Sequence, residues 1–317
     1  MGPHSSWSGA PFAGGRGFLG APFVPPAADA LAAARVTHAV YGVPFDSTTF
    51  YRTGSIHGPD AVRDASVQFL PYHFDHDVDL GERIVLADCG NAAAVPGNAE
   101  ATFRAVREDL RELYAAGVTP VVLGGEHSVT IPAAAALAEH LGGPLGLVVF
   151  DTHLDTADEV GGERLSYCTP VTRTLELPAF EPRACTLVGV HGPANPRDER
   201  DRARELGVRV VSVDEIEERG IATVAAEAME RAWHGTGGVY VSVDIDCLDA
   251  AFAPGTSGAE PGGLTTRELL RAVREVGRAG YSAFDVVEVA PQYDPAGITA
   301  AAACRVVLDM LASAAAG

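Results

Sequence analysis

Side chains that can bind metal ions follow three apolar segments of the sequence. They are His127 after TPVVLGGE, Asp151, His153 and Asp155 after LGLVVF, and Asp244 and Asp246 after GVYVSV. Along an extended segment, residues two apart point to the same side, so each group faces one space. Four acidic groups brought together would repel one another strongly, and a multivalent cation relieves this at less cost than protonating them all. The pattern therefore predicts a metal centre.

The types of ligand indicate which metal is bound and how many ions. Carboxylate oxygens in the majority, with two imidazoles, suit manganese better than a metal that prefers thiolates, although iron, nickel, cobalt or zinc could enter a similar shell. Six ligands suffice for two ions that share a bridging carboxylate. Two such ions about 3.5–4 Å apart lower the pKa of a shared water enough to make it a nucleophile near neutral pH. Neighbouring Glu126 and Asp249 are as typical of surface or capping residues as of a site.

These side chains can meet only if the segments before them are strands that end at one edge of a sheet. From Thr37 onward, short β-branched runs alternate with helical stretches rich in Ala, Glu and Arg. The expected strands are THAVYGVPF, RIVLADCG, TPVVLGG, LGLVVF, ACTLVGVHG, VRVVSV, GVYVSV and AFDVVEVAP, and the clearest helices are 98–117 and 265–280. This alternation predicts a parallel sheet with helices on both faces, which binds ligands at the carboxyl ends of its strands.

The domain organisation follows from length and composition. The chain has 317 residues, of which 47% are hydrophobic, and no Pro/Ser linker interrupts it after residue 36, so we expect one catalytic domain over 36–317. Residues 1–35 are rich in Gly and Pro and predict a surface arm, which Phe12, Phe18 and Phe23 could anchor to the body or to a neighbouring subunit.

Charge and cysteine content exclude several classes of partner and site. A net charge of −19 argues against binding to nucleic acid or to an anionic membrane, since both are polyanions. The apolar runs fall short of the roughly 20 residues that cross a bilayer, and the N-terminus lacks a signal-peptide pattern. We therefore expect a cytoplasmic protein. The cysteines are odd in number and form no CxxC pair, which predicts reduced thiols at Cys89, Cys168, Cys185, Cys247 and Cys304.

At the metal-binding segments the chain resembles the ureohydrolase (arginase/agmatinase) family, and looks closest to its agmatinase, guanidinobutyrase and proclavaminate amidinohydrolase members. GGEHSVT resembles the family's GGDHS motif, FDTHLDT resembles DAHxD, and SVDIDCLDAAFAPGT resembles SxDxDxxDPxxAPGT. The resemblance covers roughly residues 36 to 312. Three separate motifs in the same order make it far more specific than one short pattern.

The resemblance implies a fold, a metal centre and a reaction. The fold would be the three-layer α/β/α arginase type with a mostly parallel central sheet, assembled into trimers or hexamers. Two Mn²⁺ ions would be held by His127, Asp151, His153, Asp155, Asp244 and Asp246. Asp155 would also orient the nucleophile, Glu288 would hold the guanidinium group, and Thr156 and His191 would contact the small-molecule substrate. The reaction would cleave a guanidino or amidino C–N bond, giving an amine and, from a guanidine, urea.

Several residues depart from the family pattern. The family's proton-shuttling histidine belongs to an HGTP motif, but this chain reads YCTP, with Tyr167 at that position. A positioned acid or base contributes typically 10²–10⁴ in rate, so Tyr167 or another group must replace it, or the leaving group needs less help. In addition, His191 stands for the usual Arg, Glu126 for Asp, and Asn91 for Asp. These changes suggest a specialised guanidino or amidino substrate, such as one in a biosynthetic pathway.

Two other functions fit the same residues. One is a formimino or amide hydrolase with the same metal pair, because the related formiminoglutamase branch also lacks the HGTP histidine. The other is a non-catalytic, metal-holding subunit, which Tyr167 favours slightly but the retention of all six ligands and Glu288 disfavours.

Overall fold

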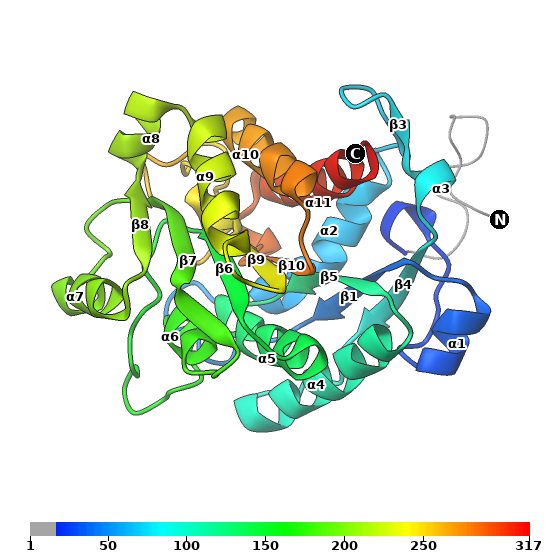
Figure 1. The fold of residues 1–317 in the computed structure, drawn as a ribbon, viewed down its shortest axis with the longest axis horizontal. Coiled ribbons are helices and arrows are strands. Elements are labelled where there is room, and N and C mark those ends of the chain that lie inside the picture. The colour runs from blue at the N-terminus through cyan, green and yellow to red at the C-terminus, as the bar shows by residue number, and fades with distance from the viewer. Residues whose placement is uncertain (1–16) are drawn as a thin grey trace.

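The computed structural model describes residues 17–317, so the expectation for Phe12 lies outside the described residues. An eight-stranded sheet forms the centre, in the order β4-β1-β5-β10-β9-β6-β7-β8, and every neighbouring pair is parallel (Figure 1). Its strands are β1 (His38–Val43), β4 (Leu86–Asn91), β5 (Thr119–Gly124), β6 (Leu145–Phe150), β7 (Phe180–Val190), β8 (Arg209–Ser212), β9 (Gly238–Asp244) and β10 (Ala283–Val287). They coincide with the eight segments expected from the sequence.

Helices cover both faces of this sheet, which confirms the three-layer α/β/α arrangement (Figure 1). One layer holds α2 (Gly58–Ser66), α3 (Leu80–Arg83), α8 (Val213–Arg219), α9 (Ile221–Trp233), α10 (Thr266–Ala279) and α11 (Ile298–Ala315). The other holds α1 (Ala28–Ala33), α4 (Ala99–Ala115), α5 (Thr130–Leu141), α6 (Pro170–Leu175) and α7 (Arg197–Leu206). An antiparallel pair, β2 (Tyr72–His73) and β3 (Val78–Asp79), was not expected.

Each helix layer has its own apolar core, because successive side chains of a strand point to opposite faces. Along β9, Val239 and Val241 pack into the core beneath α9 and α10, while Tyr240 between them packs into the core beneath α4 and α5. Strands buried on both faces are typical of parallel sheets. The expected helices begin at side-chain caps: Asn98 accepts from the Ala101 amide, and Thr265 begins α10 with a capping box.

The described part of the N-terminal segment is anchored to the domain at Phe18, one of the three phenylalanines expected to do this. Phe18 is fully buried, and its amide donates to the Asp88 carboxylate at 2.8 Å, which also forms a buried ion pair with Arg63. Phe23, by contrast, is 69% exposed. Composition alone could not show that the buried Asp88 carboxylate takes a further donor from this segment.

The expectation that no apolar segment is long enough to cross a bilayer was wrong for the last helix. Pro295–Ala315 is long and apolar enough by length and composition, but 72% of an apolar 18-residue stretch within it is buried inside the protein. Its apolar residues pack against α10 and α2, so α11 is a core helix of this fold.

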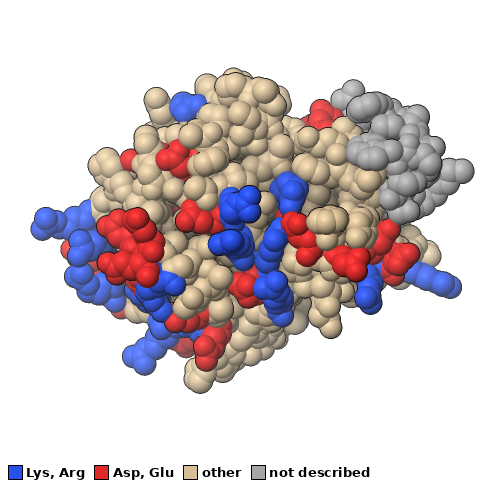
Figure 2. All heavy atoms as spheres, turned by 90° about the horizontal axis from the view of Figure 1, so that it is seen from above, with Lys and Arg blue, Asp and Glu red and all other residues tan. Residues whose placement is uncertain are grey.

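Basic and acidic side chains are mixed on the face of the molecule that Figure 2 shows. The expectation that the protein binds no nucleic acid stays a prediction.

The strand order determines where the candidate ligands lie. The four central strands are neighbours in the order β5, β10, β9, β6, and each carries a candidate residue just beyond or at its carboxyl end. Because all four run in the same direction, these ends meet at one edge of the sheet.

Candidate metal centre

Two groups of three side chains at this edge can each hold one cation. The first is His127, Asp151 and Asp244, and the second is Asp151, His153 and Asp246. Within each group, one ligand atom of every residue lies within 4.8 Å of the others. Asp151 belongs to both groups, so the structure brings the predicted ligands together around one shared carboxylate.

The two oxygens of Asp151 face different groups. Its Oδ2 lies 3.0 Å from Nδ1 of His127, whereas its Oδ1 lies 3.3 Å from Nδ1 of His153. Beside these atoms, Asp244 Oδ2 is 3.2 Å from His127 Nδ1, and Asp246 Oδ2 is 3.2 Å from His153 Nδ1. Asp151 could therefore offer one oxygen to each of two cations, which a binuclear site would use.

Asp155 completes the group around His127. Its Oδ2 lies 2.8 Å from His127 Nδ1, and its side chain is almost fully buried. Its backbone has φ 49°, a left-handed conformation that non-glycine residues seldom adopt. Strain of this kind is retained only where the surrounding structure fixes it, and it is common at functional sites.

The chain alone is short of positive charge here. Burial disfavours a charged imidazole, yet the carboxylates of Asp151, Asp155 and Asp244 raise the pKa of His127 well above its usual value. Burial and repulsion from Asp246 raise the pKa of Asp244, and burial with repulsion from Asp151 raises that of Asp155 to about 6. Such shifts are expected where carboxylates crowd together without a cation.

Unpartnered atoms also fit a metal. His127 Nδ1 is buried within 3.2 Å of three carboxylate oxygens, one of them Asp151 Oδ2, yet neither atom has a partner in hydrogen-bond geometry in the described structure. Buried polar atoms are nearly always bonded, so an exception at ligand-type atoms fits a metal ion. The donor set of imidazole nitrogen and carboxylate oxygen therefore suits two divalent cations.

A buried network holds His127 from behind. Its Nε2 lies 3.0 Å from Ser242 Oγ, which donates to Asp285 Oδ1 at 2.6 Å. Oδ2 of Asp285 accepts from Tyr240 and Thr130 hydroxyls, both at 2.7 Å. Ser242 and Asp285 are paired neighbours on β9 and β10, so sheet register sets this contact. Such partners fix the ring orientation of a metal-binding histidine.

Glu288 presents a second buried carboxylate beside the metal-ligand residues. Its Oε1 accepts from the His127 amide at 2.8 Å, and its Oε2 accepts from Ser257 Oγ at 2.7 Å. No ion pair to Glu288 occurs among residues 17–317. Burial, with repulsion from Glu126 and Asp246, raises its pKa to about 8. Like Asp155, it has a positive φ, at 65°.

Glu126 ties two loops to the edge of the sheet. It is fully buried and accepts from the amides and hydroxyls of Thr48 and Thr49, and from the Ser128 hydroxyl at 2.6 Å. Thr48 Oγ in turn accepts from the Tyr167 amide at 3.0 Å. Glu126 is therefore not a surface residue. It is a buried residue that anchors the loops beside the site.

A glycine makes the close approach of these loops possible. A Cβ on Gly125 would lie 2.0 Å from the carbonyl oxygen of Phe45, which accepts from the Glu126 amide. Any side chain at position 125 would therefore push the loop away.

Tyr167 lies at the rim of the site. Its ring packs edge-on against Phe50, with 5.2 Å between ring centroids. Burial, with the neighbouring Cys168 and the carboxylates of Glu288 and Asp155, raises the pKa of the phenol. The phenol therefore stays protonated at ordinary pH and can donate a hydrogen bond but cannot act as a base. Its catalytic role stays a prediction.

Thr156 and His191 are held by backbone contacts. Thr156 is fully buried, and its hydroxyl donates to the Glu199 carbonyl at 2.8 Å. His191 Nδ1 lies 2.9 Å from the Gly189 carbonyl oxygen, and the His191 amide donates to the Thr152 carbonyl at 3.1 Å. The side chain of Thr156 thus fixes the start of α7, and direct substrate contact by either residue stays a prediction.

Glu199 was not predicted as a site residue, because it lies in the highly charged segment NPRDERDRARE. Its carboxylate accepts from the Thr156 amide at 3.2 Å, and burial with repulsion from Asp155 raises its pKa to about 7. Asp285 was also missed, although a carboxylate inside the apolar run AFDVV was a usable signal.

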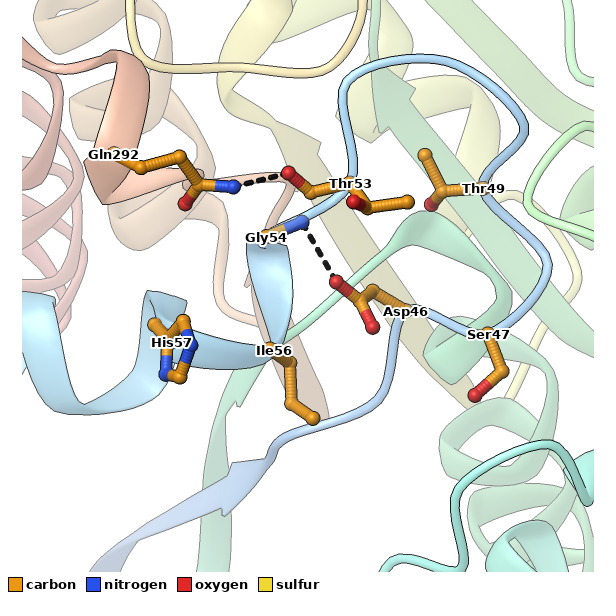
Figure 3. Close-up of a pocket in the computed structure, with 8 residues that line it drawn as sticks. All are labelled: Asp46, Ser47, Thr49, Thr53, Gly54, Ile56, His57 and Gln292. Carbon is orange, nitrogen blue, oxygen red and sulfur yellow. Dashed lines mark hydrogen bonds between the residues drawn. The ribbon is translucent and has the colours of Figure 1, made fainter.

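A cavity of about 700 Å³ adjoins this centre beneath the 46–54 loop (Figure 3). Thr49, which bonds to Glu126, lies at its wall, and the Asp46 carboxylate accepts from the Gly54 amide at 2.7 Å. Gln292 reaches across to the Thr53 carbonyl. None of the six metal-ligand candidates lines this cavity, so it is a neighbouring space.

All five cysteines are free in this structure, and their redox state stays a prediction. Cys168 is partly exposed, and the other four are buried.

Comparison with known proteins points to one family. The model of the Arginase family matches residues 36–312. A proclavaminate amidinohydrolase from Streptomyces clavuligerus is 37% identical over 272 residues, which cover 86% of each chain. A guanidinopropionase from Pseudomonas aeruginosa is 35% identical over 271 residues, covering 85% of this chain and 84% of that protein. The solved structure of proclavaminate amidinohydrolase from Streptomyces clavuligerus superimposes with a TM-score of 0.88 at 34% identity, covering 97% and 99% of the two chains.

The buried network behind His127 makes a testable prediction. Asp285→Asn removes the charge and one acceptor oxygen that orient Ser242, so we expect Mn²⁺ affinity to fall by about 10–100-fold. Isothermal titration of metal-free protein measures this. Asp214→Asn, at an exposed position in α8, is the matched control and should bind as the wild type does. Equal affinity in both variants, with the fold intact by circular dichroism, would contradict a role for the network.

Proposed function

The chain belongs to the arginase family, and we propose that it is a binuclear manganese amidinohydrolase that cleaves a guanidino compound to an amine and urea. Like its relatives, it is a hydrolase of C–N bonds in linear amidines. Two features support the manganese centre and the guanidino substrate. The Asp151 carboxylate belongs to both groups of metal ligands, and the buried Glu288 carboxylate has no ion-pair partner among residues 17–317. The ligand groups would hold two cations, and Glu288 would hold the cationic group of the substrate.

The metal pair, when bound, supplies a nucleophile from water near neutral pH. The six candidate ligands His127, Asp151, His153, Asp155, Asp244 and Asp246 would hold it. The repulsion that raises the pKa of Asp244 and Asp155 supports this assignment, because divalent charge would relieve it.

Glu288 would bind the guanidinium group. Each of its oxygens already accepts one hydrogen bond, from the His127 amide or from Ser257, and a carboxylate offers about four acceptor positions. Planar N–H groups could therefore pair with the remaining lone pairs. Because its pKa is raised to about 8, Glu288 must lose a proton at neutral pH, and an arriving cation would favour that loss.

Asp155 would handle the proton. During hydrolysis an O–C bond forms, the C–N bond breaks, and the proton released by water must reach the leaving amine. Its carboxylate Oδ2, 2.8 Å from His127 Nδ1, lies inside the group of ligands and could accept the proton that water releases there. The neutral phenol of Tyr167 at the rim could donate to the leaving nitrogen in place of the family's histidine.

The substrate is proposed to be a specialised guanidino or amidino compound. The relatives include a guanidinopropionase and a proclavaminate amidinohydrolase. In addition, Tyr167 stands where the common family motif has histidine. We also propose that the protein is cytoplasmic and assembles as a trimer or hexamer.

The proposed reaction predicts urea as a product. Manganese-loaded protein should release urea from at least one of agmatine, arginine, guanidinobutyrate, guanidinopropionate, guanidinobutyramide and guanidine, in a coupled assay. Glu288→Gln should lower kcat/KM for that compound by a factor of about 30 or more, because truncating a buried charge pair costs 2–5 kcal/mol. Glu181→Gln, at an exposed position, should leave it unchanged.

Other products would separate the alternatives. Ammonia or an amide cleavage product without urea would assign a formimino or amide hydrolase, and no turnover with metal bound would assign a non-catalytic member. Hydrolysis of agmatine as efficient as in a dedicated agmatinase would contradict the specialised substrate.

Tyr167 supplies a separate test of the proton path. If its hydroxyl donates to the leaving amine, Tyr167→Phe should lower kcat by about 10²-fold or more with little change in KM. Tyr167→His should restore activity and add a group that titrates near pH 6.5 to the pH profile of kcat. Full activity in Tyr167→Phe would show that another group carries the proton.

A further inference from the structure

A separate cluster of ligand-type side chains lies where the β2–β3 hairpin meets α11. It consists of His73, His76 and Asp309, each with a ligand atom within 4.8 Å of the others. Thr299, at the start of α11, contacts the loop near the metal centre through the Gly255 amide. Asp309 lies ten residues later, about 15 Å further along the helix axis at 1.5 Å per residue. The cluster is therefore distinct from the binuclear centre.

The imidazoles of this cluster are buried beside one carboxylate. The side chains of His73 and His76 are 8% and 6% exposed, and Asp309 is fully buried. Nε2 of each ring faces Asp309 but does not make a hydrogen bond to it in the described structure. Because buried polar atoms are nearly always bonded, two Nε2 atoms in this position fit a ligand that they share.

The spacing of the donors fits one small cation. His73 Nε2 lies 3.3 Å from Asp309 Oδ2, and His76 Nε2 lies 3.7 Å from Asp309 Oδ1. Ligands about 2.0–2.1 Å from a tetrahedral ion are separated by roughly 3.3–3.4 Å. The two rings meet edge to face with 4.7 Å between centroids, so both can face the same point.

The surrounding charges are balanced before any cation binds. Asp309 accepts from Arg274 Nε at 2.6 Å and from Arg305 at 3.0 Å, and Asp75 pairs with the other end of Arg274 at 2.5 Å. Two guanidinium groups thus face two carboxylates. The two guanidinium groups would repel a cation and weaken its binding.

We propose that His73, His76 and Asp309 form a second metal site, selective for a zinc-type divalent ion, which joins the β2–β3 hairpin to α11. Two imidazoles with a single carboxylate favour zinc over manganese, which prefers oxygen ligands. The ion would bind Nε2 of both rings and the Asp309 carboxylate, and so hold the hairpin against the helix.

Zinc stoichiometry tests this site in the full-length protein. Manganese-loaded wild type, His76→Ala and the exposed control His234→Ala are dialysed against the same free Zn²⁺ and analysed by mass spectrometry for both metals. Zinc that replaces manganese in the binuclear centre lowers manganese equally in all three. We expect wild type and His234→Ala to hold one more zinc per chain than His76→Ala. Equal zinc in all three would overturn the proposal.

Hydrogen exchange tests the joining role. Zinc should slow amide exchange over residues 71–80 at least several-fold in wild type and in His234→Ala, and not in His76→Ala. If His76→Ala fails to fold, His76→Gln, which keeps most of the side-chain volume, takes its place in both experiments. Extra zinc without slower exchange at the hairpin would leave a metal site but contradict its role in holding the hairpin.

Discussion

Electrostatic repulsion between buried carboxylates is the constraint on which this structure depends. The four aspartates that follow β6 and β9 have their carboxylates in one space almost free of solvent. Without cations, burial and mutual repulsion raise the pKa of Asp244 and Asp155, which means that folding works against ionising them. Two divalent ions would attract the carboxylates and offset their mutual repulsion. We therefore expect bound metal to stabilise the site, which repulsion destabilises in the metal-free chain.

The fold maintains this arrangement through its sheet and through small residues. Strand order places β5, β10, β9 and β6 side by side, and register pairs Asp285 with Ser242 directly behind His127. A Cβ on Gly258 would lie 2.6 Å from the His153 ring and 2.7 Å from the Asp246 carboxylate, so only glycine allows this loop to cover the ligands. The positive φ of Asp155 and Glu288 costs about 1–3 kcal/mol each, and tight packing on both faces of the sheet holds these residues in place.

Much of this could be predicted from sequence, because periodicity and residue type report directly on burial and on metal chemistry. The eight strands follow from runs such as LGLVVF, and the ligands from the polar residues at their ends. Contacts between distant segments could not be predicted in this way. The role of Glu126 as a loop anchor depends on two threonines 77 and 78 positions away, and the packing of Phe18 depends on Asp88. The buried face of α11 was missed because an alanine-rich helix has a weak amphipathic pattern.

The central claim is that Asp151 joins two metal ions, and anomalous diffraction from crystals of the manganese-loaded protein tests it most directly. The account predicts two anomalous peaks per chain, about 3.5–4 Å apart, as in two-metal sites generally. One oxygen of Asp151 should contact each peak, with His127 beside one and His153 beside the other. A single peak, or two peaks that do not share Asp151, would contradict the account.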